Sequence, residues 1–134
     1  NLNGARVQHQ EALALAQKRN KVTHIYELVK ACPDTRFQLA HMGGGIFFFT
    51  SLKKEVSRVL SRCVFDTAAA PFLYRPGVYR AFFELAGEGR LLYGSDYPLL
   101  SLARYEKEFR AAGISTEQEV SIMGGAAGTF WKLN

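Results

Sequence analysis

The apolar positions of this chain form short runs that alternate with longer amphipathic stretches. Three runs, at 37–40, 63–65 and 91–93, recur 27 residues apart, counted from positions 37, 64 and 91. Short apolar runs separated by helical patterns predict the buried strands of a parallel sheet. Each run leads into a side chain that can take part in catalysis: His41, Asp66 and Asp96. Because the carboxyl ends of parallel strands form one face of such a fold, we expect these side chains to converge there.

Amphipathic stretches between the runs predict helices at about 24–32, 52–62, 78–86, 101–112 and from 116 towards 131. Their apolar stripes follow the helical period. The residues expected to face the core are Ile25, Leu28, Val29, Cys32, Leu52, Val56, Val59, Leu60, Leu102, Tyr105, Phe109 and Ala112. A further, polar helix is expected at 5–20. The alternation of strands and helices predicts the α/β class.

Turn and capping residues mark the ends of these elements. Pro71–Gly77 is expected to be a loop, because its two prolines oppose regular structure. Gly113 fits a left-handed helix C-cap. Thr116 with Glu119 three residues later fits a capping box that opens the last helix.

Of the 134 residues, 48% are hydrophobic and 22% are charged. This composition is typical of a globular domain with a hydrophobic core. The net charge is +5, but no basic run is longer than Lys53-Lys54, so no nucleic-acid partner is predicted. Cys32 and Cys63 show neither metal-ligand spacing nor a disulfide framework, which favours buried free thiols in a reducing compartment. No stretch has the length and apolarity of a membrane span or of a signal peptide. We therefore expect a cytoplasmic protein without a membrane partner.

Four ordered motifs carry a family resemblance. They are His41-Met42-Gly43-Gly44-Gly45, Phe65-Asp66-Thr67-Ala68-Ala69, Tyr93-Gly94-Ser95-Asp96-Tyr97-Pro98 and Ile122-Met123-Gly124-Gly125-Ala126-Ala127. Together they resemble the metal-dependent amidohydrolase-2 family, which includes TIM-barrel hydrolases and the aminocarboxymuconate-semialdehyde decarboxylase group. The resemblance implies that 24–134 is the C-terminal part of a (βα)8 TIM barrel, with about three parallel strands and flanking helices. Residues 1–23 are expected to form an N-terminal helical segment.

The resemblance implies roles for two of the strand-end residues. Asp96 matches the aspartate after the last barrel strand, which binds a divalent metal, here expected to be zinc, and helps to handle the proton of its water. The alternative is that Gly94–Pro98 is only a turn in which Asp96 caps the next segment. His41 matches the histidine after the sixth strand, which orients or deprotonates the attacking water or polarises the substrate. Its alternative is a structural histidine at a strand end.

Other residues near these motifs have supporting interpretations. Asp66 is interpreted as a second-shell or structural carboxylate rather than a metal ligand. Arg75 can clamp a substrate carboxylate in a bidentate fork, or it is a surface arginine that packs on Tyr74. Gly43–Gly45 indicates a sharp bend or a close backbone approach, and a phosphate cradle is disfavoured because no Gly-Lys-Ser or Gly-Lys-Thr follows. Phe47–Phe49 either lines an apolar pocket or, as we favour, seals the barrel rim.

The chain also departs from the family pattern. Family members carry a His-x-His pair on the first strand and another histidine after the fifth, whereas His9, His24 and His41 are the only histidines here. A catalytic zinc usually takes three protein ligands. Ala126 stands where the family has an asparagine. The chain begins at Asn1 rather than Met, and three strands leave open sheet edges, so we expect a missing N-terminal barrel portion or a homo-oligomer.

Two functions remain open. The first is part of a metal-dependent hydrolase or decarboxylase that acts on a small, carboxylate-bearing or cyclic substrate. The second is a non-catalytic remnant or assembly module of the same fold. The presence of His41 and Asp96 favours the first for the parent protein, and the missing His-x-His pair favours the second for this chain alone.

Overall fold

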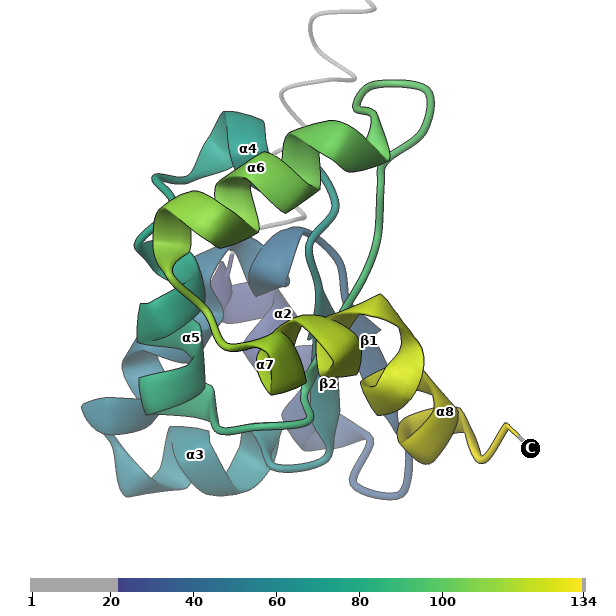
Figure 1. The fold of residues 1–134 in the computed structure, drawn as a ribbon. Coiled ribbons are helices and arrows are strands. Elements are labelled where there is room, and N and C mark those ends of the chain that lie inside the picture. The colour runs from purple at the N-terminus through teal and green to yellow at the C-terminus, as the bar shows by residue number, and fades with distance from the viewer. Residues whose placement is uncertain (1–21, 134) are drawn as a thin grey trace, which may run out of the picture.

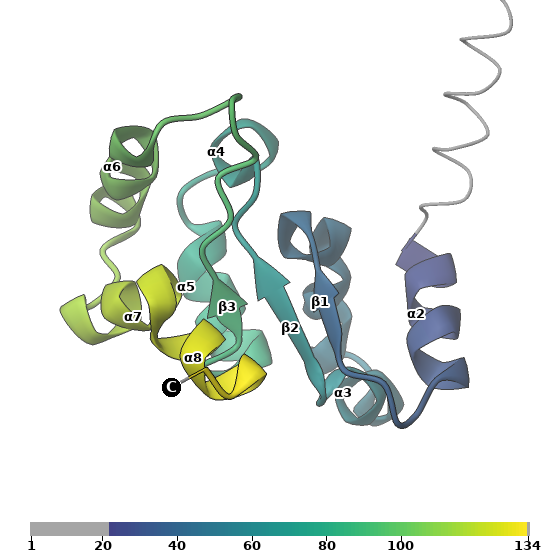
Figure 2. The ribbon, with the colours of Figure 1, turned by 90° about the vertical axis from the view of Figure 1, so that its right-hand side faces the viewer.

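A parallel three-stranded sheet forms the centre of the molecule. The computed structural model describes residues 22–133. Within them the strands lie side by side in the order β1 (Phe37–Leu39), β2 (Cys63–Asp66) and β3 (Leu91–Leu92). Both strand pairs are parallel, and Figure 2 shows the three arrows pointing the same way. The predicted α/β class is confirmed. Because the strands are parallel, their carboxyl ends lie together at one end of the sheet.

Helical segments connect and flank the strands (Figure 1). In chain order they are α2 (Val22–Ala31), the 3-10 segment η1 (His41–Ser51), α3 (Lys54–Leu60), α4 (Ala70–Leu73), α5 (Val78–Ala86), α6 (Leu102–Ala112), α7 (Thr116–Val120), the π-helical turn η2 (Ser121–Gly125) and α8 (Ala126–Trp131). No helix within residues 22–133 has both the length and the apolarity that crossing a membrane requires. The helix expected at 5–20 lies outside the described residues.

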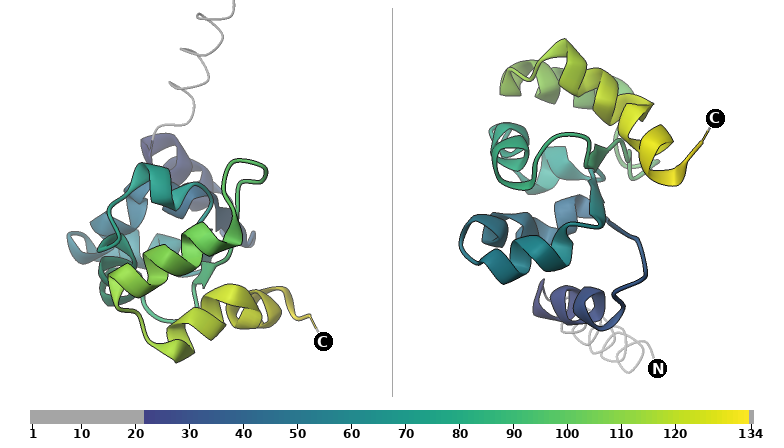
Figure 3. Two further views of the ribbon diagram at one scale, coloured as in Figure 1. Left: turned by 45° about the horizontal axis from the view of Figure 1, so that its top comes forward. Right: turned by 90° about the horizontal axis from the view of Figure 1, so that it is seen from below.

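The two faces of the sheet pack against different partners. Cys63 and Phe65 of β2 enter the main core, which the sheet shares with α2, η1, α3, α5 and α6. Val64 points to the other face, where it packs with Leu92 and with Ala126 of α8. The views in Figure 3 show α8 apart from the stack formed by α2, α3 and α5. Helices therefore cover one face along its length, and the C-terminal helix covers part of the other.

Several expected boundaries agree with the structure. The helix predicted at 78–86 is α5, and the one predicted at 101–112 is α6, which ends at the left-handed Gly113 with φ 65°. Tyr105, Phe109 and Ala112 are buried as expected. Helix α2, predicted from about residue 24, begins at Val22.

Three leucines expected in the core are instead exposed. Leu28 is 56%, Leu52 71% and Leu102 44% exposed. Leu52 follows η1 and precedes α3, so the period of that helix does not extend to it. Leu102 is the first residue of α6, before the helix reaches the core. On α2 only Val29 is fully buried, because the stripe that meets η1 and α3 is narrower than the apolar pattern.

Two local predictions are also corrected. The expected loop at Pro71–Gly77 contains the end of the short helix α4, because Pro71 occupies the first turn, where a missing N–H costs nothing. The capping box is formed by Ser115 and Gln118, one residue before the expected pair. Both of its hydrogen bonds are present, between the Ser115 Oγ and the Gln118 N–H and between the Gln118 Oε1 and the Ser115 N–H.

An arginine precedes each strand at the amino end of the sheet. Arg62 donates to the Val29 carbonyl in the last turn of α2. Arg90 donates to the carbonyls of Leu60, Ala86 and Cys63, the first two being the final residues of α3 and α5. A guanidinium suits these positions because the carbonyls at a helix C-terminus lack partners and carry partial negative charge.

The first arginine of this set contacts helix α8. Arg36 donates to the Phe130 carbonyl of α8. Its guanidinium also lies 5.1 Å from the centre of the Phe130 ring and 5.6 Å from that of Trp131. The three arginines together fasten helix ends to the start of the sheet.

Candidate functional site

The predicted site residues lie at the carboxyl edge of the sheet. His41 comes two residues after β1, Asp66 is the last residue of β2, and Asp96 lies in the loop after β3. In Figure 2 this edge is at the top, beside α4 and the loop that follows β3. The parallel topology therefore places all three residues at one end of the sheet, as the spacing of the apolar runs predicts.

The chain leaves β1 through a left-handed turn. His41 and Met42 have φ values of 56° and 52°, and the three glycines from Gly43 to Gly45 continue at 64°, 63° and 86°. A Cβ on Gly43 would lie 2.7 Å from Ile46 Cγ2 and 3.1 Å from Phe65 Cε1. The glycines thus serve both the bend and the close approach that the sequence indicates.

His41 is held at three points. Its backbone N–H donates to Asp66 Oδ1 at 3.1 Å, and its carbonyl accepts from the Tyr74 hydroxyl at 2.7 Å. The ring Nδ1 lies 2.8 Å from the Ala68 carbonyl oxygen. Because a carbonyl only accepts, this contact requires the proton on Nδ1 and leaves a lone pair on Nε2 of the neutral ring. The imidazole can therefore bind a cation or accept a proton through Nε2.

Asp66 is the centre of a hydrogen-bond network. Its side chain is buried at 6% exposure and accepts from the N–H groups of His41 and Ala68 and from Gln38 Nε2. Gly94 lies against it, since a Cβ there would be 3.2 Å from Asp66 Cγ. The carboxylate thus holds Gln38 and the backbone of the two loops that follow β1 and β2.

Asp96 is exposed at the same edge, with φ 55°. Within residues 22–133 its carboxylate makes no hydrogen bond or ion pair, while its backbone carbonyl accepts from the Leu99 N–H at 2.9 Å. A left-handed φ is costly for a residue with a side chain, and strained backbone of this kind clusters at functional sites. The side chain is thus free to bind a ligand from a backbone position held by the surrounding turn.

Tyrosine side chains support the site in a way that the apolar pattern does not reveal. Besides Tyr74, the buried Tyr105 of α6 accepts from the Ala69 N–H at 3.0 Å and donates to the Ser95 carbonyl at 2.9 Å. Burial, together with the negative charges of Asp96 and Asp66, raises the pKa of Tyr105, so the hydroxyl keeps its proton. The helical period predicts only that Tyr105 faces inward.

Arg75 is exposed and lines a hollow of about 250 Å³ with Phe48, Tyr74 and residues of α5. Neither His41 nor Asp96 lines this hollow. Tyr74, the residue before Arg75, donates a hydrogen bond from its hydroxyl to the His41 carbonyl. Arg75 therefore follows directly after a residue that contacts the candidate site.

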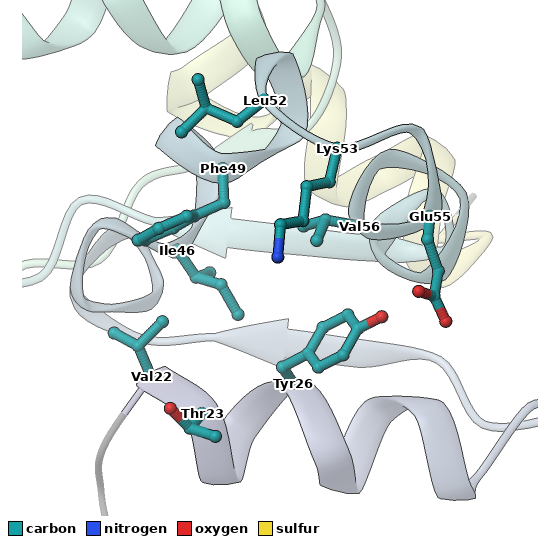
Figure 4. A pocket seen from close by; sticks show the side chains of 9 residues that line it. All are labelled: Val22, Thr23, Tyr26, Ile46, Phe49, Leu52, Lys53, Glu55 and Val56. Atoms are coloured by element: carbon teal, nitrogen blue, oxygen red, sulfur yellow. The ribbon is translucent and has the colours of Figure 1, made fainter.

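A second, apolar hollow lies in the helical layer. It has a volume of about 370 Å³ and is bordered by α2, η1 and the start of α3, as Figure 4 shows. Phe49 lines it, whereas Phe47 is fully buried against Phe48 and Phe82. None of the three strand-end site residues borders it. The Phe47–Phe49 run is therefore divided, with Phe47 sealing the core and Phe49 facing a cavity.

Metal-ligating side chains are few in this part of the protein. Among residues 22–133, no three His, Cys, Asp or Glu side chains come together in a group able to hold a metal ion. Cys63 is buried and Cys32 is partly exposed, and neither forms a disulfide. Of the three strand-end side chains, His41 and Asp96 are the ones not already bonded to backbone N–H groups.

Comparison with known families identifies the chain. The family model described as amidohydrolase (Amidohydro_2) matches residues 9–133. The chain belongs to this amidohydrolase family. No curated protein sequence matches it.

Solved structures with the same fold include amidohydrolase-fold decarboxylases. The chain resembles a dihydroxybenzoic acid decarboxylase from Polaromonas with bound manganese and the inhibitor 2-nitroresorcinol, with a TM-score of 0.70 and 18% identity over 84% of this chain and 40% of that one. It resembles 5-carboxyvanillate decarboxylase LigW from Sphingomonas paucimobilis with a TM-score of 0.67 and 18% identity, over 84% and 39% of the two chains. An amidohydrolase from Burkholderia multivorans with bound zinc gives 0.59 and 15%, over 84% and 49%.

This amidohydrolase chain spans about two fifths of the length of the decarboxylases that it matches. Its three strands and flanking helices are thus a part of a TIM barrel, as the resemblance implies.

Proposed function

We propose that this chain forms part of the active site of a metal-dependent amidohydrolase-like enzyme, a hydrolase or decarboxylase of a small organic substrate. The observation that carries the proposal is the placement of His41 after β1 and of Asp96 after β3, at the same end of one parallel sheet. TIM-barrel enzymes place their active sites at this edge. The presence of manganese and zinc in solved structures of the same fold supports a divalent metal, and we propose zinc here.

The donor atoms at this edge fit part of such a site. A carboxylate oxygen on Asp96 and the Nε2 of His41 are suitable ligands for zinc or manganese. The remaining ligands would come from residues outside 22–133 or from another copy of the chain. A bound divalent metal would supply Lewis acidity and lower the pKa of a coordinated water.

The chain's own residues have distinct proposed roles. Asp96 holds the metal, and His41 accepts or returns a proton at Nε2. Asp66 keeps the backbone that carries the imidazole in place. Arg75 binds a carboxylate of the substrate, for which its exposed guanidinium is suited. The free thiols of Cys32 and Cys63 support our placement of this enzyme in the cytoplasm.

We also propose that other strands complete the barrel, supplied by a missing N-terminal portion or by another copy of the chain. Among the described residues β1 pairs only with β2, so its outer edge carries unpaired backbone groups. Size-exclusion chromatography with hydrogen exchange tests this proposal. A stable monomer with slow exchange in all three strands contradicts it.

Metal analysis of the purified protein tests the function itself. We expect zinc to bind, and Asp96→Asn to lower its affinity by at least about tenfold because the anionic ligand is lost. Asp34→Asn is the matched control, since Asp34 is an exposed aspartate in the turn after α2. Equal binding by both variants contradicts the role of Asp96.

The second candidate is a non-catalytic assembly module. The absence of a three-ligand group within residues 22–133 favours it. No metal binding under any loading condition, including after assembly with further copies, supports this candidate over the enzyme.

A further inference from the structure

Tyr105 makes two hydrogen bonds that core packing does not require. Its side chain is fully buried, and its ring packs edge-on against Tyr93 with the centroids 5.2 Å apart. A phenylalanine would make the same ring contacts. The hydroxyl, however, accepts from the Ala69 N–H at 3.0 Å and donates to the Ser95 carbonyl at 2.9 Å. These two bonds call for an explanation of their own.

Each bond reaches a peptide unit that carries or orients a candidate catalytic residue. The Ala69 N–H belongs to the same peptide unit as the Ala68 carbonyl, whose oxygen lies 2.8 Å from His41 Nδ1. The Ser95 carbonyl belongs to the same peptide unit as the N–H of Asp96. A chain of hydrogen bonds therefore runs from the His41 imidazole, through the Ala68–Ala69 peptide and the Tyr105 hydroxyl, to the backbone of Asp96.

All donors in this chain point the same way. Nδ1–H of His41 donates to Ala68, the Ala69 N–H donates to Tyr105, and the Tyr105 O–H donates to Ser95. Hydrogen bonds aligned in this manner polarise and strengthen one another. The Tyr105 hydroxyl thereby strengthens the Ala68 carbonyl as an acceptor for the Nδ1 proton.

Three residues linked by this chain of hydrogen bonds have strained backbone. His41, Ala69 and Asp96 have φ values of 56°, 55° and 55°, in the left-handed region that residues with a Cβ avoid. Such conformations persist only where surrounding contacts hold them. Tyr105 bonds to Ala69 itself and to the residue before Asp96, so it is placed to hold two of the three.

We propose that Tyr105 is a positioning residue that fixes His41 in the tautomer with a free Nε2 and at the same time fixes the backbone of Asp96. The significance of this role rests on the proposed function. The geometry itself is testable without metal or substrate. Tyr105 thus links the two sides of the site through the loop that follows β2.

The test compares Tyr105→Phe with Tyr79→Phe by long-range ¹⁵N–¹H NMR of the histidine rings. Tyr79 is the matched control, because its buried hydroxyl has no partner among the described residues. In the wild type and in Tyr79→Phe, His41 is expected to carry its proton on Nδ1. In Tyr105→Phe the ratio of the Nδ1–H to the Nε2–H tautomer is expected to fall about 1.5-fold, because the Ala68 carbonyl loses the polarisation that the Tyr105 hydroxyl gives it. The amide resonances of Ala69 and Asp96 shift in the same variant.

Two results overturn the proposal: a wild-type His41 protonated on Nε2, or a Tyr105→Phe variant whose His41 tautomer and Asp96 amide match the wild type. If Tyr105→Phe does not fold, the wild type decides. We expect a slowly exchanging Tyr105 hydroxyl proton with a nuclear Overhauser effect to the Ala69 amide, and its absence overturns the proposal. Loss of the metal function alone leaves these readouts unchanged, so the two failures are distinguishable.

Discussion

The two ends of the sheet use charged residues for opposite purposes. At the amino end, guanidinium groups such as those of Arg62 and Arg90 bind backbone carbonyls at helix termini, and none faces an acidic partner within residues 22–133. At the carboxyl end, Asp66 binds backbone N–H groups of left-handed loops, and the Asp96 carboxylate is left exposed. The amino end closes helices onto the sheet, whereas the carboxyl end holds strained loops in place.

Under the proposed function, this contrast separates stability from function. In TIM barrels the amino-terminal face of the strands serves stability and the carboxyl-terminal face carries the active site. The proposed function implies the same division in this three-stranded part. Substitutions at the two ends are therefore expected to differ in kind as well as in size.

The largest effect is expected at the amino end, for Arg90→Ala. The change leaves the carbonyls of Leu60, Ala86 and Cys63 without their donor and removes the guanidinium from the face of Phe65. We expect the free energy of unfolding to fall by about 3 kcal/mol, measured by urea denaturation. Arg80→Ala, at an exposed position of α5, is the control and is expected to change it by less than about 0.5 kcal/mol. Equal losses of unfolding free energy in the two variants would contradict a stabilising role of the amino-end arginines.

A smaller loss with a different signature is expected at the carboxyl end, for Asp66→Ala. The N–H groups of His41 and Ala68 lose their acceptor, which lowers the free energy of unfolding by about 2 kcal/mol. The His41 tautomer changes as well, whereas in Arg90→Ala it does not. Asp66→Asn keeps an acceptor oxygen and is expected to retain most of the stability. A histidine spectrum that responds equally to Arg90→Ala and Asp66→Ala contradicts the separation of the two ends.

Asp96→Gly is expected to raise the free energy of unfolding rather than lower it. Glycine relieves the left-handed φ of 55°, so this variant is expected to gain up to about 1 kcal/mol of unfolding free energy while it loses the proposed metal ligand. Asp34→Gly has no left-handed strain to relieve and is not expected to gain stability. Thermal unfolding of the two variants side by side measures the difference. A destabilised Asp96→Gly would mean that the carboxylate supports the fold.

The smallest effect is expected in the core between the two ends, for Tyr79→Phe. Burial raises the pKa of Tyr79 above the ordinary value of 10.0, so the folded protein keeps the proton that the unfolded chain releases. Stability from this group is complete below about pH 10 and is lost as the pH rises above it. Between neutral pH and about pH 10.5 the free energy of unfolding falls in both proteins. The fall is expected to be about 0.8 kcal/mol smaller in the variant than in the wild type. Parallel pH profiles for the two proteins would contradict this expectation.

The strands and the edge that carries the site follow from the sequence for a simple reason. Apolar runs at a regular spacing leave few topologies, and a parallel sheet aligns their ends, so His41 and Asp96 could be placed without coordinates. The bounds of α5 and α6 agree with the sequence prediction to within a residue. Local periodicity failed at Leu52, which lies between two elements, at Leu102 in the first turn of α6, and at Leu28, where the buried stripe of α2 is narrower than its apolar pattern.

The supporting residues could not be predicted, because their partners are backbone atoms. The arginines appear scattered along the chain, and their common position before each strand has meaning only once the helix ends lie beside them. Tyr105 reads as an apolar core residue, since the helical period cannot distinguish a ring that packs from a hydroxyl that also bonds two loops. A backbone acceptor leaves no signature in the side-chain pattern.

The contact between Arg36 and Phe130 has a consequence for synthesis. The two residues are 94 positions apart, and the first lies before β1 while the second lies in the final helix. As the chain emerges from the ribosome, β1 can pair with β2 early. The Arg36 guanidinium, however, can bind the Phe130 carbonyl only after α8 has been made. The Arg36 guanidinium thus acquires this partner only after 94 further residues have been made, and a nascent chain that stalls before Phe130 leaves the guanidinium without this carbonyl.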